Sequence, residues 1–158
     1  MTLVKRKSVR AILLTEDNEV LMMKLNNKKM QWEGWITPGG GVEPDEDSES
    51  ALKRELYEEL GLSEFEIGPQ VWYRTHQLHW AGQDIEQSEK FYLIKTSKFE
   101  PKPMLELNEH EKAAFEGFNW WSVDELLVSQ EVFAPKKLPA LLKDLIATGV
   151  PVFARSVE

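Results

Sequence analysis

Residues 39–62 read GGGVEPDEDSESALKRELYEELGL, and the rest of the chain is organised around this stretch. Its second half predicts a short helix that begins after Asp47, a favourable N-cap residue. Gly61 stands where a left-handed residue would end that helix. At roughly 100° per residue, the apolar side chains fall on one stripe, which we expect to pack into a core. The stripe consists of Leu52, Leu56 and Leu60.

Next to this stripe the helix carries a cluster of carboxylates: Glu55, Glu58 and Glu59. Like charges one helical turn apart, such as Glu55 and Glu59, cost roughly a few tenths of a kcal/mol. A divalent cation removes that cost, because carboxylate oxygens are the ligands that Mg²⁺ takes, and Mg²⁺ commonly bridges to substrate phosphates. On charge pattern alone, the alternative is an acidic helix face exposed to solvent.

The spacing of these residues resembles a known family signature. Gly40 is followed after five residues by Glu46, and after seven more by Arg54-Glu55-Leu56-x-Glu58-Glu59-x-Gly61-Leu62. This resembles the Nudix hydrolase signature G-x5-E-x7-R-E-U-x-E-E-x-G-U, in which U is a bulky aliphatic residue, at every fixed position. Such a match is much more specific than a lone glycine motif and favours the metal-binding interpretation. Residues 40–62 are called the box below.

The resemblance implies a fold, a cofactor and a set of roles. The implied fold is α/β, a Nudix α/β/α sandwich with a mixed β-sheet between helices. The implied cofactor is Mg²⁺, with Mn²⁺ as a substitute, and clustered carboxylates of this number suit several ions. The implied metal ligands are Glu55, Glu58, Glu59 and the carbonyl of Gly39. Arg54 would orient a box glutamate by charge-assisted hydrogen bonding, with Glu46 in support.

The general base is a separate question, because Nudix enzymes draw it either from the box or from a later loop. The later loop here is predicted at residues 108–116. Glu111 and Glu116 are equal candidates for the catalytic carboxylate within it. The alternative is that both are solvated loop residues.

Substrate recognition has weaker signals. We expect Arg10, Lys24 and Arg74 to meet distal phosphates, although basic residues on strands are more commonly surface charges. Trp72 is a candidate to stack on a nucleobase. Further aromatic or imidazole candidates are Trp32, Tyr73, His76 and Trp80, although most aromatics in a sheet belong to a core.

Composition and charge bound the remaining possibilities. The chain has 158 residues, 42% hydrophobic and 29% charged, which fits a single globular domain over residues 1–158. Its formal net charge of −8 argues against broad binding to nucleic acid or to an anionic membrane. Cysteine is absent, so no disulfide or thiolate chemistry is available. No apolar run reaches membrane-spanning length, and a cytoplasmic location follows by default. A homodimer is left open.

The remaining elements are predicted from local patterns. A strand hairpin is expected over residues 9–14 and 20–25, and an antiparallel pair over the segments near residues 71–76 and 90–96. A short strand is expected at residues 117–121. A capping box at Ser122 should open a helix, and a last amphipathic helix should run from Pro139 to Thr148.

The sequence thus predicts Mg²⁺-dependent hydrolysis of a pyrophosphate bond in a nucleoside diphosphate linked to another moiety. A nucleoside triphosphate or an oxidised nucleotide is the rival substrate. A nucleotide-binding regulatory module without turnover is an alternative of a different class, although a binder has no need of three metal carboxylates. An isopentenyl diphosphate isomerase is disfavoured, because its catalytic cysteine has no counterpart.

Overall fold

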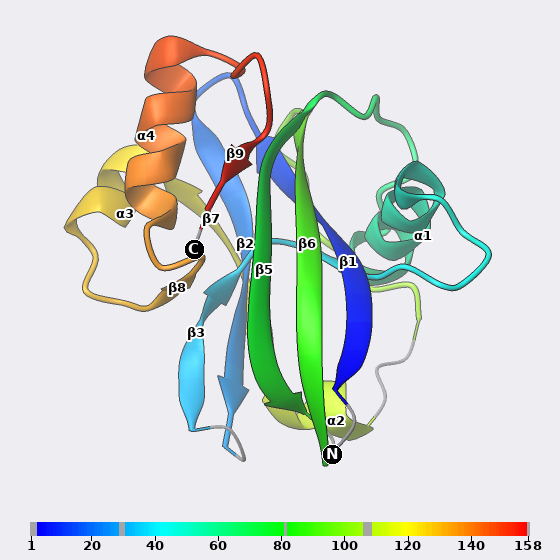
Figure 1. Cartoon of the computed structure of the whole chain (residues 1–158). Helices are drawn as coiled ribbons and strands as arrows, with labels where there is room; N and C mark the ends of the chain where they lie inside the picture. The colour runs from blue at the N-terminus through cyan, green and yellow to red at the C-terminus, as the bar shows by residue number, and fades with distance from the viewer. Residues whose placement is uncertain (1–2, 29–30, 81, 106–108, 158) are drawn as a thin grey trace.

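The computed structural model describes residues 3–28, 31–80, 82–105 and 109–157, and only the backbone at residues 80 and 109–111. Short helices are interspersed among the strands of one sheet (Figure 1). Their bounds are β1 Val4–Leu14, β2 Glu19–Asn27, β3 Trp32–Ile36, β4 Gly39–Gly41, α1 Ser48–Leu60, β5 Gln70–Trp80, β6 Gln83–Lys95, α2 Glu109–Ala114, β7 Phe115–Ser122, α3 Val123–Val128, β8 Phe133–Ala134, α4 Leu138–Thr148 and β9 Arg155–Ser156.

The sheet is mixed, with strand order β8-β3-β2-β1-β6-β5-β9. Strand β1 runs parallel to β6 from Val4 opposite Ile85 to Leu14 opposite Lys95. On its other edge β1 pairs with β2 only near Leu14, and the short strand β4 pairs there instead, with Arg10 opposite Gly39. Strand β2 turns away to pair with β3 and β7. The glycine turn of the box therefore lies directly beside β1.

Helices cover both faces of the sheet, which confirms the predicted α/β sandwich with a mixed sheet (Figure 1). Helix α1 packs on one face through Leu52, Leu56 and Leu60, each at most 1% exposed. Helices α3 and α4 cover the other face, where Leu126 and Leu142 join the second core cluster. The apolar stripe of α1 is therefore the buried stripe that its spacing predicts.

The predicted helix ends are also confirmed. The Asp47 side chain accepts a hydrogen bond from the Ser50 amide, and Gly61 ends α1 with a φ of 70°. Ser122 and Glu125 form the expected capping box at α3. Helix α4 begins one residue before the expected Pro139 and ends at Thr148 as expected.

Two predictions need correction. The segment 108–116 is not a single irregular loop, because α2 runs through residues 109–114 and β7 starts at Phe115. Glu116 therefore belongs to a strand. Trp72 is 2% exposed and packs against Phe91, with ring centroids 5.7 Å apart. Its ring belongs to the core, so the prediction that it stacks on a nucleobase is wrong.

In the described part of the chain, every helix is too short or too polar to cross a bilayer.

Candidate active site

The glycine turn approaches β1 so closely that a side chain does not fit. Gly39 has a φ of 147°, and a Cβ added there would lie 1.9 Å from the Val9 carbonyl oxygen. Its amide donates a hydrogen bond to Glu59 Oε1 at 2.9 Å. Glycine is required at this position because it alone adopts such a φ readily and allows the backbones to touch. The turn is thereby joined to the last turn of α1.

Arg54 links the carboxylates of the box to one another. Its Nε and Nη2 donate to the two carboxylate oxygens of Glu46 at 2.7 and 2.8 Å. Nη1 donates to Glu55 Oε1 at 3.0 Å and, more weakly, to Glu58 Oε2 at 3.4 Å. Nη2 also donates to the Gly41 carbonyl at 2.9 Å. These are charge-assisted hydrogen bonds of the kind the sequence predicts for Arg54, and they hold the helix against the turn.

Glu46 and Glu55 both contact Arg54, but their pKa values shift in opposite directions. The hydrogen bonds from the Arg54 side chain and from the backbone amide of Glu43 lower the pKa of Glu46 to about 2. Burial raises the pKa of Glu55, and the hydrogen bond and charge of Arg54 offset only part of that effect. Glu55 is therefore a half-buried carboxylate with too little positive charge around it, which is the condition that a bound cation relieves.

The box residues fit a divalent cation by chemistry, although they do not enclose one as they stand. Across the described residues, no three His, Asp or Glu side chains converge in a way that could hold a metal ion. The guanidinium of Arg54 lies between Glu55 and Glu58 instead. These carboxylates are hard oxygen donors that already share one positive group, and a bound cation would compete with Arg54 for them.

Gly40 provides the space that the Glu55 carboxylate occupies. A Cβ at Gly40 would lie 2.4–2.6 Å from the carboxylate atoms of Glu55. Because that carboxylate ends a flexible side chain, Gly40→Ala should displace it and leave the fold intact. We expect catalytic efficiency to fall at least about tenfold, as when the support of a metal ligand is lost. Steady-state kinetics and chemical denaturation measure the two effects.

The matched control is Gly41→Ala, whose Cβ would meet the Arg6 guanidinium first, at 2.9 Å. Arg6 also ends a flexible side chain and is not one of the box carboxylates, so this variant should lose less activity than Gly40→Ala. Equal losses of activity in both variants would show that the turn, and not the Glu55 carboxylate, is the sensitive feature.

A cavity of about 420 Å³ lies on the side of β1 that faces away from α1. It lies between residues of β2, β3 and β8 and residues of β5 and β6. Its lining residues nearest the glycine turn are Arg10, which pairs with Gly39, and Thr37, which precedes Gly39 by two residues. Its aromatic and aliphatic lining includes Trp32, Ile36, Phe91 and Phe133. Its cationic lining comprises Arg6, Arg10, Arg74 and Lys136.

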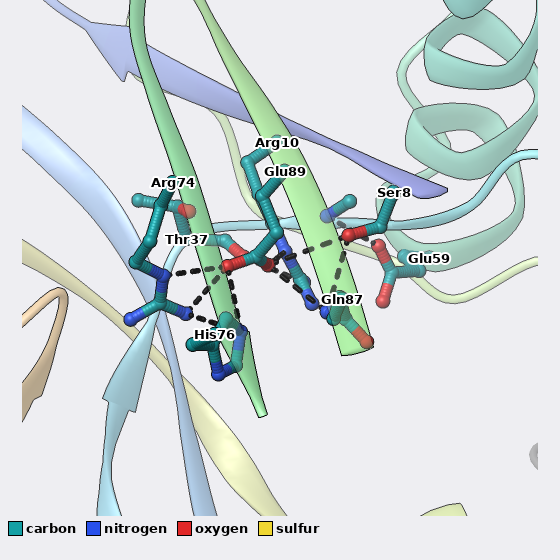
Figure 2. Close-up of polar contacts among 9 residues, drawn as sticks. Ser8, Arg10, Thr37, Glu59, Arg74, His76, Gln87 and Glu89 are labelled. Atoms are coloured by element: carbon teal, nitrogen blue, oxygen red, sulfur yellow. Dashed lines mark hydrogen bonds and ion pairs between the residues drawn. The ribbon is translucent and has the colours of Figure 1, made fainter. Parts of the chain in front are cut away.

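Glu89 lies at the centre of a polar cluster on this cavity (Figure 2). One carboxylate oxygen accepts from Arg10 Nε at 2.8 Å, and the other accepts from Arg74 Nε at 2.8 Å. The remaining neighbours are Ser8 Oγ at 3.4 Å, Gln87 Nε2 at 3.2 Å and His76 Nε2 at 3.2 Å. We call these six residues the Glu89 cluster.

The charges of the Glu89 cluster reinforce one another. Burial alone would raise the pKa of Glu89, but Arg10, His76 and Arg74 hold it well below its usual range. Burial alone would lower the pKa of Arg10, but Glu89 outweighs that effect and raises it, with smaller contributions from Glu59 and Glu55. The positive charge of Arg10 is therefore stabilised both by the cavity carboxylate, Glu89, and by the box carboxylates Glu59 and Glu55.

Sequence reasoning did not identify Glu89. The available signal was the alternation of β6, in which Ile85, Phe91 and Leu93 share one buried face. Gln87 and Glu89 stand on that same face, at 8% and 3% exposed. Two polar residues within an otherwise apolar face indicate a buried polar site, because an unpaired carboxylate is too costly to bury.

Lys24 and Glu116 come together away from the cavity lining. Lys24 Nζ lies 3.4 Å from Glu33, 3.8 Å from Glu116 and 4.0 Å from Glu131. It also lies 5.8 Å from the centroid of the Trp35 ring. Three carboxylates already neutralise this lysine, and it is not part of the cavity that Arg10 and Arg74 line. The structure thus provides no support for a phosphate contact at Lys24. The side chain of the other base candidate, Glu111, lies outside the described residues.

Comparison with known proteins agrees with this architecture. The sequence pattern of the NUDIX domain family matches residues 4–143. An RNA pyrophosphohydrolase of Pseudomonas putida is 31% identical over 130 residues, which cover 74% of this chain and 76% of that protein.

Two solved structures are similar over most of their length. The solution structure of the E. coli ORF135 protein has a TM-score of 0.61 and 27% identity, and the match covers 96% of each chain. The NUDIX domain of Shewanella oneidensis NrtR, solved with ADP ribose, has a TM-score of 0.64 and 19% identity, with 93% of this chain and 88% of that one covered. At 19% identity, the likeness to NrtR shows a shared fold only.

Proposed function

The chain belongs to the NUDIX family and is a pyrophosphohydrolase, and on that premise we propose that it hydrolyses a nucleoside diphosphate linked to another moiety with the help of Mg²⁺. The reaction splits the phosphoanhydride bond with water and leaves a phosphate on each half of the substrate. The name of the Pseudomonas putida relative supports pyrophosphate hydrolysis in general.

One observation supports the choice of substrate: a cavity with both aromatic and cationic lining lies beside β1, where its lining residue Arg10 pairs with Gly39 of the glycine turn. The cavity of about 420 Å³ falls in the usual range for small-molecule sites. Trp32 offers an aromatic surface to a nucleobase. Arg10 and Arg74 line the same cavity, and Arg10 lies opposite Gly39 in the β1–β4 pairing. This arrangement suits a substrate in which a diphosphate joins a nucleoside to a second group.

The metal-holding role is proposed for the box. Mg²⁺, or Mn²⁺ in its place, would be held by Glu55, Glu58, Glu59 and the Gly39 carbonyl. When bound, such a cation neutralises phosphate oxygens and lowers the pKa of coordinated water. Arg54 orients the Glu46 and Glu55 carboxylates, while Arg10 and Arg74 hold the phosphates in position for attack.

The general base stays with the two predicted candidates. Glu116 lies on β7 and contacts Lys24 and Asn26, so its carboxylate is already engaged. The Lys24 contact is long, at 3.8 Å, so Glu111 and Glu116 stay equal candidates for the base. The variants Glu111→Gln and Glu116→Gln, compared in one assay, separate the two candidates.

A substrate screen tests the proposal. The purified chain is incubated with Mg²⁺ and with ADP-ribose, dinucleoside polyphosphates, oxidised and ordinary nucleoside triphosphates, and a short RNA bearing a 5′-triphosphate. Products are separated by anion-exchange chromatography, and phosphorus NMR identifies the bond that is cleaved. We expect the highest kcat/KM for a nucleoside diphosphate linked to another moiety.

Other outcomes of the screen point to other functions. Preference for a triphosphate would favour the rival substrate class, and preference for the RNA would extend to this chain the activity in the relative's name. Tight binding without turnover across the panel would indicate a regulatory module. A cytoplasmic location and a homodimer stay predictions from the sequence.

A further inference from the structure

The Glu89 cluster is hard to explain by stability alone. Glu89 continues the face of β6 that carries Phe91 and Leu93, where apolar side chains would extend the core. A buried ion pair is commonly no more stabilising than well-packed apolar residues of similar volume. A carboxylate with two guanidiniums at this position therefore suggests a role in binding.

The cluster carries an excess of positive charge. Two guanidiniums share the single carboxylate of Glu89, so one positive charge is not neutralised within the ion pairs. In the described part of the chain, Arg10 uses Nε and Nη1, the latter donating to the Thr37 carbonyl at 3.2 Å. Arg74 uses Nε and Nη2. The second terminal amino group of each guanidinium is left for a ligand.

The side chain of Thr37 also indicates that a polar ligand binds in this cavity. Thr37 is 1% exposed and lines the same cavity. Its hydroxyl is buried without a hydrogen-bond partner among the described residues. A buried hydroxyl without a partner costs free energy, so a bound acceptor beside Arg10 would relieve this cost as well.

We propose that Glu89 is a positioning residue that holds the guanidiniums of Arg10 and Arg74 over the cavity, so that together they bind one phosphate group of the substrate. This inference rests on the proposed function, and it adds the residue that organises phosphate binding. Glu89 itself does not touch the substrate.

Titration of the full chain with inorganic pyrophosphate tests the inference without requiring turnover. Metal is removed with EDTA, so that the arginines dominate binding, and the Nε–H resonances of Arg10 and Arg74 are followed by NMR. In the wild type we expect both resonances to shift on titration. In Glu89→Gln we expect Kd to rise at least about tenfold, because charge-assisted hydrogen bonds no longer hold the guanidiniums.

The matched control is Glu86→Gln, which removes a carboxylate from the same strand outside the cavity lining. Its Kd should equal that of the wild type. An unchanged or lower Kd in folded Glu89→Gln, or no shift of either resonance in the wild type, would overturn the inference. If Glu89→Gln does not fold, Arg74→Lys replaces it. A lysine retains the ion pair with Glu89 but lacks the second amino group that would bind the phosphate, so the same rise in Kd is expected. An unchanged Kd in this variant overturns the inference.

In the presence of Mg²⁺, the same variants separate this inference from the proposed function. With the best substrate of the screen, Glu89→Gln should raise KM at least about tenfold and change kcat little. A wild type whose pyrophosphate affinity depends on Glu89, yet which hydrolyses nothing, would contradict the proposed function and leave the positioning role of Glu89 standing.

Discussion

Glu58→Gln is expected to lower kcat/KM for Mg²⁺-dependent hydrolysis by at least about 100-fold while the chain stays folded. The substitution keeps the size of the side chain and removes the negative charge that would hold the cation. The fold should tolerate it, because the contact of Glu58 with Arg54 is long, at 3.4 Å, and the side chain is 28% exposed. Steady-state kinetics and thermal denaturation, measured on the same preparation, test both statements.

The control for this variant is Glu49→Gln, on the exposed first turn of the same helix. It removes the same charge outside the carboxylate cluster and should leave kcat/KM within about twofold of the wild type. If Glu58→Gln retains full activity, the box carboxylates do not serve the reaction in the way we propose.

Arg54→Met is expected to destabilise the fold at neutral pH, because Glu46 and Glu55 lose their charge-assisted hydrogen bonds. The loss should depend on pH. Hydrogen bonding to Arg54 lowers the pKa of Glu46 to about 2, from an ordinary value of 4.5. A carboxyl whose pKa is lowered in the folded state stabilises the fold above its unfolded pKa, and this contribution disappears as the pH falls toward the folded pKa.

Urea denaturation of both proteins between pH 7 and pH 2.5 measures this dependence. The difference in unfolding free energy should be full above about pH 5 and should shrink steadily below pH 4.5. Arg54→Lys, which keeps the charge without the two-pronged geometry, should fall between the two proteins. A difference that is constant with pH would contradict the assigned hydrogen bonds.

The box was predictable from sequence because its structure is local. The leucine stripe of α1, the N-cap at Asp47 and the left-handed Gly61 follow from residues within one or two helical turns of each other. The contacts of Arg54 are predictable for the same reason, because Glu46, Glu55 and Glu58 lie within eight residues of it. Short-range spacing is sufficient to bring these side chains together.

The Glu89 cluster could not be predicted because it depends on pairing between distant strands. Ser8 and Arg10 meet Glu89 across the parallel pairing of β1 and β6, 81 and 79 residues apart in sequence. The prediction for Trp72 was wrong for a related reason. A bulge between Gln70 and Trp72 shifts the register of β5, so that Val71 and Trp72 both enter the core. Alternation alone does not locate such a bulge.

The most direct test of the central claim is anomalous diffraction from a crystal of this chain soaked with Mn²⁺ and a non-hydrolysable nucleotide. The account predicts an anomalous peak between the carboxylates of Glu55, Glu58 and Glu59 and the Gly39 carbonyl, in contact with the diphosphate. A nucleotide bound without any such peak, with Glu55 and Glu58 still paired to Arg54, would contradict it.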